Sequence, residues 1–358
     1  MLDSHATYPY RPVIFALESP QQRAAYEQMK SSQSDFVVID TLEDQVVELL
    51  VTRNPRLKSQ PEKLAVQIRK EVGNGGWDSY GTWSWYPWLN TWVRLLPEDA
   101  FIEVRTNRNR NKITTEEQHH LRSKCVGIVG LSVGSAVAMV LAMERICGAL
   151  KLVDFDTIEL SNLNRIPAGV HRLGLPKTVA LARTIAEIDP FFKVELIHEG
   201  FTESNANQVF DEIDLVVDAC DQVQAKANLR WFAKSQKIPL VMETSDRGML
   251  DVERYDAPNQ PFLHGRISEA MLEEMRSSSE WRPEFFDAFI DMEAASTRGV
   301  DSLKRVGDEL VGWPQLYSDV AGGGAHVAQV IRKILLGERV VDARHYLEWD
   351  EQLIESVH

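Results

Sequence analysis

A glycine-bearing turn and several charged side chains downstream of it carry the chemistry that this sequence offers. Gly130, Ser132 and Gly134 follow a short apolar run and precede a helical pattern. A strand–turn–helix of this kind presents free backbone N–H groups to an anion, and glycine lets the backbone turn sharply and approach a phosphate. The turn departs from the GxGxxG pattern because Ser132 takes the middle place, and a tight turn without a ligand would look the same.

Asp154 closes the next apolar run, where a doubly wound fold places a carboxylate on the ribose hydroxyls of a nucleotide. Asn164, Arg165 and Lys177 add an amide and two cations just beyond that position. A nicotinamide cofactor has no need of these cations. Cleavage between the α and β phosphates of ATP does need them, because negative charge builds on the phosphates. Simple surface charges are the alternative for Arg165 and Lys177.

Asp221 follows the apolar run 213–218 and falls at the carboxyl end of that predicted strand, the usual ligand edge of such sheets. A carboxylate there suits Mg²⁺, which keeps several waters and bridges phosphates. A helix N-cap is the alternative role for Asp221. These residues together predict chemistry on ATP phosphates rather than hydride transfer.

The elements that position these residues alternate between strand and helix from Ile113 onward, which predicts a parallel sheet. Strands are expected at 125–129, 150–153, 194–197, 213–218, 238–243 and 250–255, and helices at 133–145, 177–188, 225–234 and 319–336. A polar helical insertion is expected at about 266–305. The predicted fold class is α/β, a doubly wound, mostly parallel, Rossmann-like sheet.

A small α/β unit is expected at 1–100, ahead of a larger domain at 101–358. Its predicted strands are 13–17 and 36–40, and its predicted helices are 20–30 and 43–50. Five of the chain's nine tryptophans lie between Trp77 and Trp92 at the end of this unit. A packing hairpin is one interpretation of them, and an aromatic clamp for a peptide or planar ligand is the other.

The composition of the chain limits where the protein is expected to be located and which partners it is expected to bind. The formal net charge of −14 counts against a broad nucleic-acid-binding surface. No apolar run reaches the ~18 residues needed to cross a bilayer, and residues 1–5 show no start of a secretory signal. Cys125, Cys147 and Cys220 are too few for a disulfide framework or a CxxC zinc site. A cytoplasmic location without membrane contact is therefore expected.

The run from Asp154 to Arg165, DFDTIELSNLNR, resembles the signature of the E1-like superfamily, which includes ThiF, MoeB and ubiquitin-activating enzymes. The resemblance covers roughly residues 105–260 and implies an adenylyltransferase that uses ATP and Mg²⁺ to activate a carboxylate, with release of pyrophosphate. The implied substrate is the C-terminus of a ubiquitin-like or sulfur-carrier protein, or of a peptide. The implied nucleotide-binding residues are Gly130, Ser132, Gly134, Asp154, Asp156 and Asn164.

The resemblance also implies that Arg165 and Lys177 contact phosphates and that Asp221 lies near Mg²⁺ and the reacting groups. An arginine that precedes the domain reaches into the partner subunit's site in such proteins, so a homodimer is expected. Arg110 is the best candidate here and Arg108 is the second. A solvated linker is the alternative for the basic run 105–112 that contains both.

The sequence departs from the family pattern in several places. The turn has fewer glycines than the family's GxGGLG, Ile166 replaces the usual glutamine, and Gln222 replaces an asparagine. No cysteine follows Cys220, which itself is expected in the core. Because a thioester requires a thiolate nucleophile, the acyl-adenylate should persist or pass to a nucleophile brought by another molecule.

Three alternatives to this function stay open. The first is a tRNA-modifying dehydratase of the same superfamily, which the acidic net charge disfavours. The second is an NAD(P)-dependent oxidoreductase, which would leave both cations and Asp221 without a role. The third is a catalytically silent nucleotide-binding scaffold. Residues 243–248 either line the side of the site where the acyl acceptor enters or form a hairpin turn.

Overall fold

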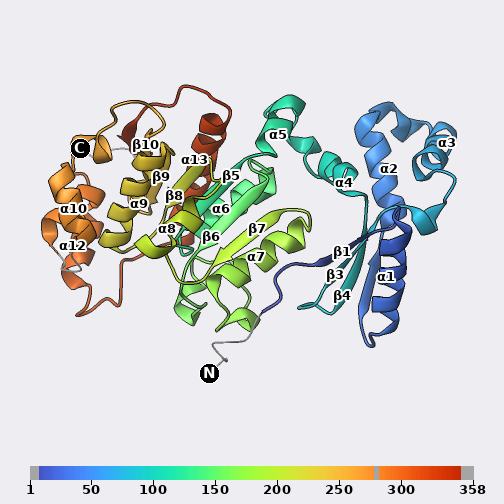
Figure 1. Cartoon of the computed structure of the whole chain (residues 1–358), viewed down its shortest axis with the longest axis horizontal. Coiled ribbons are helices and arrows are strands. Elements are labelled where there is room, and N and C mark those ends of the chain that lie inside the picture. Colours follow the sequence, from blue (N-terminus) through green and yellow to red (C-terminus); the bar gives the residue numbers. More distant parts are fainter. Residues whose placement is uncertain (1–7, 278–281, 348–358) are drawn as a thin grey trace, which may run out of the picture. The chain divides into compact units, whose positions relative to one another are not determined.

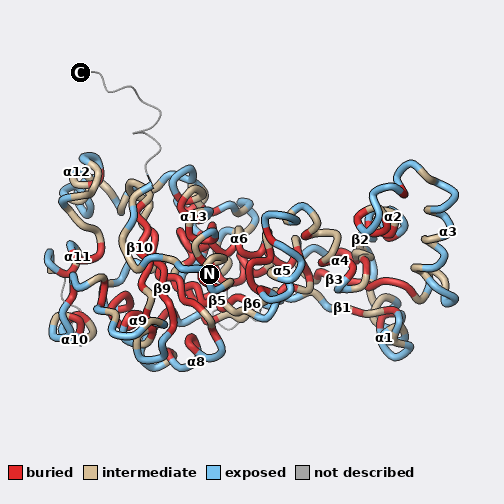
Figure 2. The backbone as a smooth tube through the Cα atoms, turned by 90° about the horizontal axis from the view of Figure 1, so that it is seen from above, coloured by how far each residue is buried: buried red, intermediate tan, exposed pale blue. Residues whose placement is uncertain are grey.

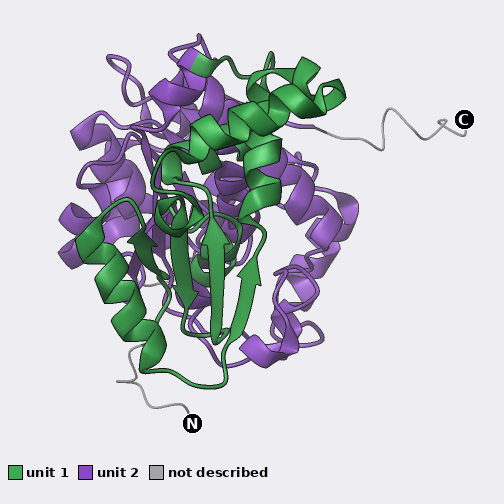
Figure 3. Ribbon diagram, turned by 90° about the vertical axis from the view of Figure 1, so that its right-hand side faces the viewer, with its two compact units in different colours: residues 1–115, 182–192 green, residues 116–181, 193–358 purple. Residues whose placement is uncertain are grey.

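The computed structural model describes residues 8–277 and 282–347 (Figure 1). Residues 1–5, which are expected to hold no start of a secretory signal, and residues 278–281 of the predicted insertion lie outside these ranges. The chain forms two compact units, which comprise residues 1–115 with 182–192 and residues 116–181 with 193–358 (Figure 3). The predicted division into domains at about residue 100 stays a prediction.

The first unit is built on a four-stranded sheet of order β1-β3-β4-β2, in which β2 runs parallel to β4 and the other pairs are antiparallel. Its elements are β1 (Val13–Ala16), α1 (Pro20–Ser31), β2 (Val37–Asp40), α2 (Leu42–Arg53), α3 (Pro61–Val72), β3 (Thr82–Tyr86), β4 (Thr91–Leu95) and α4 (Glu98–Arg105). The two strands and two helices expected before residue 51 are confirmed. α1 begins where the Ser19 hydroxyl accepts the N–H of Gln22, with Pro20 as its first residue.

Three tryptophans of the β3–β4 hairpin belong to one of the hydrophobic clusters of the first unit. Trp83, Trp85 and Trp92 are buried together with Phe15 and Tyr26, and the ring of Tyr26 stacks on that of Trp83 at 5.4 Å. An indole buried on all sides has no face to offer to a ligand. The packing interpretation is therefore confirmed for these three tryptophans, and a clamp built from them is wrong.

The second unit holds a seven-stranded sheet of order β11-β10-β9-β8-β5-β6-β7. Its strands are β5 (Cys125–Val129), β6 (Ala149–Val153), β7 (Lys193–Ile197), β8 (Leu215–Asp218), β9 (Leu240–Thr244), β10 (Met249–Glu253) and β11 (Ala343–His345). The strands from β7 to β9 in this order are parallel, whereas β10 pairs antiparallel with both of its neighbours. The prediction of a mostly parallel, doubly wound sheet is confirmed, and residues 245–248 form the predicted hairpin turn.

Helices cover this sheet, and its central strands are buried (Figure 2). The helices are α5 (Thr115–Leu121), α6 (Gly134–Glu144), α7 (Lys177–Ile188), α8 (Ala206–Phe210), α9 (Val223–Gln236), α10 (Glu269–Ser277), α11 (Pro283–Ile290), α12 (Thr297–Arg305) and α13 (Tyr317–Leu335). The part of the predicted insertion that the structure describes consists of α10, α11 and α12. Among the described helices, none is both long and apolar enough to cross a membrane.

Consecutive glycines let α13 approach its neighbours closely. A Cβ atom on Gly324 would lie 2.9 Å from the carbonyl carbon of Ala136 in α6, and one on Gly323 would overlap the carboxyl group of Glu243 in β9. A Cβ on Gly322 would meet no atom within 4 Å. Gly323 and Gly324 are thus required for packing, whereas Gly322 is not.

Substitution at the glycine contact should destabilise the second unit. Gly324→Ala should lower the free energy of unfolding by about 1–3 kcal/mol, because the added methyl group pushes α13 away from α6. Gly322→Ala is the matched control and should be neutral or slightly stabilising, since alanine favours a helix. Urea titration followed by circular dichroism measures both, and equal effects of the two changes would contradict this packing.

Candidate nucleotide site

The strand order reverses at β5, and the crevice that doubly wound sheets form at such a point is expected at the carboxyl end of β5. β6 follows β5 in the chain and lies on one side of it, whereas β8 comes later and lies on the other. Doubly wound sheets bind ligands where the strand order reverses in this way. The turn at 130–134, the end of β6 with Asp154 and the loop with Asp221 all follow strands that end at this edge.

Two glycines shape the turn between β5 and α6. Gly130 has φ of 89°, and a Cβ there would overlap the backbone of Ala219 in the loop after β8. A Cβ on Gly134 would lie 2.8 Å from the side chain of Ile128. Both positions therefore need glycine for contacts within the protein. The resulting turn leaves the N-terminal end of α6, with its unsatisfied N–H groups, at the crevice.

Asp154 ties this turn to the end of β6. Its Oδ2 accepts the N–H of Leu131 at 2.7 Å, and its Oδ1 accepts the N–H of Asp156 at 2.8 Å. Burial raises the pKa of Asp154, while the charge of Lys177 and the two N–H donors oppose that rise. Each carboxylate oxygen has lone pairs left for a further donor, such as a ribose hydroxyl.

Lys177 is the first residue of α7 and is anchored close to Asp154. Its Nζ lies 2.7 Å from Oδ2 of Asp156, which is two residues beyond Asp154. The Lys177 side chain is only 8% exposed, whereas that of Asp156 is 50% exposed. A buried ammonium group needs a partner of opposite charge. The interpretation of Lys177 as a simple surface charge is therefore wrong.

Arg165 contacts the turn directly. Its Nε donates to Oγ of Ser132 at 2.8 Å, and its Nη1 donates to the Ser161 carbonyl at 3.1 Å and to Oδ1 of Asn164 at 3.0 Å. Asn164 in turn donates from Nδ2 to the Gln315 carbonyl at 2.8 Å. The structure thus gathers Ser132, Asn164 and Arg165 at one place, with Arg165 held by several acceptors.

Asp221 and Arg110 stand apart from these contacts. Asp221 is exposed and precedes Gln222, the residue that flanks the start of α9, so Asp221 is not the cap of that helix. Within residues 8–277 and 282–347, Asp221 has no hydrogen bond or ion pair. Arg108 and Arg110 are exposed residues of the first unit. The roles foreseen for all three stay predictions.

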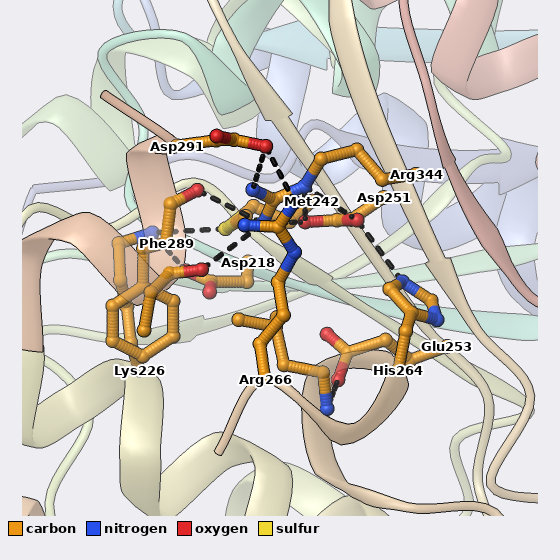
Figure 4. Close-up of polar contacts among 12 residues, drawn as sticks. Asp218, Lys226, Met242, Asp251, Glu253, His264, Arg266, Phe289, Asp291 and Arg344 are labelled. Carbon is orange, nitrogen blue, oxygen red and sulfur yellow. Dashed lines mark hydrogen bonds and ion pairs between the residues drawn. The ribbon is translucent and has the colours of Figure 1, made fainter. Parts of the chain in front are cut away.

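A buried charged network fixes the start of the loop after β8 (Figure 4). Asp218 accepts hydrogen bonds from Nη1 of Arg230 at 2.7 Å and from Nζ of Lys226 at 3.0 Å, and Arg230 also pairs with Glu253 at 2.8 Å. Burial acts to raise the pKa of Asp218, but the two cations outweigh it and lower the pKa to about 2. Asp218 is the last residue of the strand predicted at 213–218, but its partners could not be read from the sequence.

The three cysteines lie in environments that raise the pKa of their thiols. The thiol of Cys220 donates to Oδ1 of Asp218 at 3.1 Å, and burial, reinforced by that carboxylate, raises the pKa of Cys220 well above its ordinary value. Burial likewise raises the pKa of Cys147, and it raises that of Cys125 to about 11. Since the thiolate is the reactive form, these environments fit the expectation that the chain forms no thioester of its own.

His264 belongs to the same polar region and has partners distant in sequence (Figure 4). Its Nε2 lies 3.0 Å from Asp251 and its Nδ1 lies 2.7 Å from Asp342. Burial acts to lower the pKa of His264, but these hydrogen bonds raise it overall. Arg344 of β11 also donates to Asp251 at 2.6 Å. His264 therefore joins β10 to the segment that enters β11.

Glu243 is a buried carboxyl group whose environment the sequence did not reveal. It lies one residue before the carboxyl end of β9, and neither of its oxygens has a hydrogen-bond partner among the described residues. Burial, followed by the nearby charge of Asp319, raises the pKa of Glu243 to about 8. Glu243 is therefore mostly protonated at neutral pH.

This raised pKa predicts a pH-dependent loss of stability. Its ordinary value is 4.5, so the folded state binds this proton more tightly than the unfolded state. The stabilisation is complete below about pH 4.5 and is lost as the pH rises towards 8. Glu243→Gln keeps the shape without the charge, so its stability advantage over the parent should grow between pH 5 and pH 8. Denaturant titrations across this range measure that difference.

Glu199→Gln, a change at an exposed position, is the control for this experiment. Its stability relative to the parent should not follow the same trend. A difference between Glu243→Gln and the parent that stays constant from pH 5 to pH 8 would contradict the protonated state of Glu243.

The fold defines a doubly wound α/β protein whose strand order reverses at β5. The profile of the ThiF family matches residues 106–269. A molybdopterin-synthase adenylyltransferase of Haemophilus influenzae is 31% identical over 165 residues, which are 44% of this chain and 67% of that protein. The chain therefore belongs to the ThiF family of the E1-like superfamily, as the signature at 154–165 implied.

Other similar proteins have different or unassigned functions, so the family is shown but the substrate is not. A Mycobacterium tuberculosis protein of unassigned function is 42% identical over 265 residues, 73% of this chain, and the chain spans 37% of that protein's length. A tRNA threonylcarbamoyladenosine dehydratase of Bacillus subtilis is 31% identical over 161 residues, 44% of this chain and 63% of the relative. The crystal structure of PaaA has a TM-score of 0.50 at 19% identity, covers 70% of this chain and 77% of its own, and shows the same fold.

Proposed function

We propose that this chain binds ATP with Mg²⁺ at the crevice and transfers AMP to a carboxylate. The carboxylate oxygen attacks the α-phosphorus, the bond from that phosphorus to the bridging oxygen of the β-phosphate breaks, and pyrophosphate leaves. One observation carries this proposal: Asp154 links the turn, through Leu131, to the segment in which Asp156 holds Lys177. A ribose-directed carboxylate and a phosphate-directed cation thus share one sheet edge.

The charged residues have distinct roles in this proposal. Asp154 accepts the ribose hydroxyls, and the N–H groups at the start of α6 bind a phosphate. Arg165 and Lys177 balance the charge that builds as the α–β bond breaks, which stabilises the transition state more than the ground state. Lys177 exchanges Asp156 for a phosphate oxygen when ATP binds. No step requires a cysteine, in keeping with the raised pKa of Cys220.

Asp221 is the residue proposed to hold Mg²⁺. Its carboxylate is exposed at the carboxyl end of β8 and makes no ion pair with any described residue. Mg²⁺ prefers one or two carboxylates together with waters and phosphate oxygens, which a single free aspartate beside bound ATP satisfies. When bound, the metal would neutralise the leaving pyrophosphate.

ATP binding is the first test of this function. Calorimetry with ATP and Mg²⁺ should show binding that Asp154→Ala and Lys177→Ala each weaken by about tenfold or more, because each removes a charge-assisted hydrogen bond to the nucleotide. Lys193→Ala, at an exposed position where β7 begins, is the control and should bind like the parent. Preference for NADH or NADPH would refute the proposal, and ATP binding without turnover of any carboxylate would favour the scaffold alternative.

The proposed substrate is the C-terminal carboxylate of a small protein or peptide. An adenylyltransferase among the relatives supports this class, and the net charge of −14 disfavours an RNA substrate. The dehydratase relatives make tRNA the competing substrate. Pyrophosphate release on addition of carrier proteins or peptides, and its absence with tRNA, would separate the two.

We also propose that the protein acts as a homodimer in which Arg110 completes the partner's site. The loop between Asp154 and α7 exposes large apolar side chains, with Phe155 61%, Leu160 71% and Val170 69% exposed. Several exposed apolar side chains on one loop next to the charged residues of the site suit an interface with a second copy. The exposed side chain of Arg110 makes no hydrogen bond or ion pair with the described residues, so it is available to such a site.

Mixing two inactive variants tests this arrangement. Arg110→Ala and Lys177→Ala should each lose most activity, while an equal mixture of the two should regain up to about one quarter of the parent activity, because about half of the dimers are then mixed and one of the two sites in each mixed dimer is intact. Pyrophosphate release measures the recovery, and Lys112→Ala, a neighbouring change, serves as the control. No recovery in dimers shown to exchange subunits would contradict a role for Arg110 in the partner's site.

A further inference from the structure

We infer that Ser132 is a positioning residue that sets the orientation of Arg165 towards the ATP phosphates. This inference rests on the proposed function and adds a residue that acts through another. Its basis is the hydrogen bond from Nε of Arg165 to Oγ of Ser132 at 2.8 Å, which joins residues 33 apart in the chain.

The contacts of the Arg165 guanidinium leave one side of it unused. Nε donates to Ser132, and Nη1 donates to the Ser161 carbonyl and to Asn164. Nη2 has no acceptor among residues 8–277 and 282–347. A planar guanidinium held at two of its three nitrogens has a fixed plane, so the direction of its free N–H groups is fixed as well.

The position of Ser132 makes this contact relevant to the nucleotide. Ser132 lies on the turn between β5 and α6, two residues before the helix begins, and the N–H of neighbouring Leu131 is already bound to Asp154. Holding Arg165 against this turn brings its charge to the same place as the N–H groups of the helix. A mobile arginine side chain would instead lose rotamer entropy on meeting a phosphate.

The hydroxyl group is also a departure from the family pattern. The GxGGLG motif that this turn resembles has glycine where Ser132 stands, and glycine offers no side-chain acceptor to an arginine. Ser132 is half-buried, and its side chain makes this one hydrogen bond among the described residues. Its removal should therefore disturb Arg165 and leave the fold intact.

Calorimetric titration with ATP and Mg²⁺ tests the inference on the full chain. Ser132→Ala and Ser132→Gly should weaken ATP binding by about tenfold, the usual effect of losing a hydrogen bond to a charged group. Ser132→Thr keeps the hydroxyl and should restore most of the affinity. Ser123→Ala is the matched control, since its exposed hydroxyl donates to the His120 carbonyl at 2.9 Å without touching Arg165, and it should bind like the parent.

A double-substitution cycle separates positioning from a general structural effect. In an Arg165→Ala background, Ser132→Ala should weaken ATP binding by less than about twofold, because the residue through which Ser132 acts is gone. Melting temperatures without nucleotide should be unchanged in all Ser132 variants. Full additivity of the two changes, or parent-like ATP binding by Ser132→Ala, would overturn the inference while leaving the proposed function intact. A parent protein that binds no ATP would overturn both.

Discussion

The buried carboxylate of Asp154 is the constraint on which the arrangement of this site depends. It accepts backbone N–H groups from both the turn after β5 and the segment after β6, so two strand ends are held in one geometry. Without it, the buried N–H of Leu131 would lose its partner, which costs about 1–3 kcal/mol. Two cations are held next to these hydrogen bonds. Arg165 donates to Ser132, the neighbour of Leu131, and Lys177 pairs with Asp156.

On the other side of β5, the loop after β8 begins at a buried carboxylate whose charge is balanced by two cations. Asp218 ends β8 with no exposed surface, and Arg230 and Lys226 supply the cations that make burial of its carboxylate tolerable. Breaking such a pair by removing one partner leaves an uncompensated charge in the interior. The loop that carries Asp221 therefore starts from a rigid point, while Asp221 itself stays exposed. A loop that is anchored at its start and carries an unpaired carboxylate further along suits a residue that must contact a metal and a substrate.

The sequence predicted the elements that obey local rules and missed contacts that only the fold creates. β5 (Cys125–Val129) and α7 (Lys177–Ile188) match their expected bounds, because an apolar run and an amphipathic pattern each end at a clear signal. β11 (Ala343–His345) escaped notice, since three residues make no pattern and Arg344 anchors them to a distant Asp251. The spacing of Asp154, Arg165 and Lys177 suggested a shared site, but neither Ser132 as the partner of Arg165 nor the lone carboxyl of Glu243 could be foreseen.

A crystal structure of the chain with Mg²⁺ and an ATP analogue that cannot be cleaved between its α and β phosphates would test the central claim most directly. The proposed function predicts ribose hydroxyls on Asp154, phosphates between Arg165, Lys177 and the start of α6, and the Asp156–Lys177 pair opened by the nucleotide. An analogue bound elsewhere, or bound at the crevice with the phosphates turned away from Arg165 and Lys177, would contradict it.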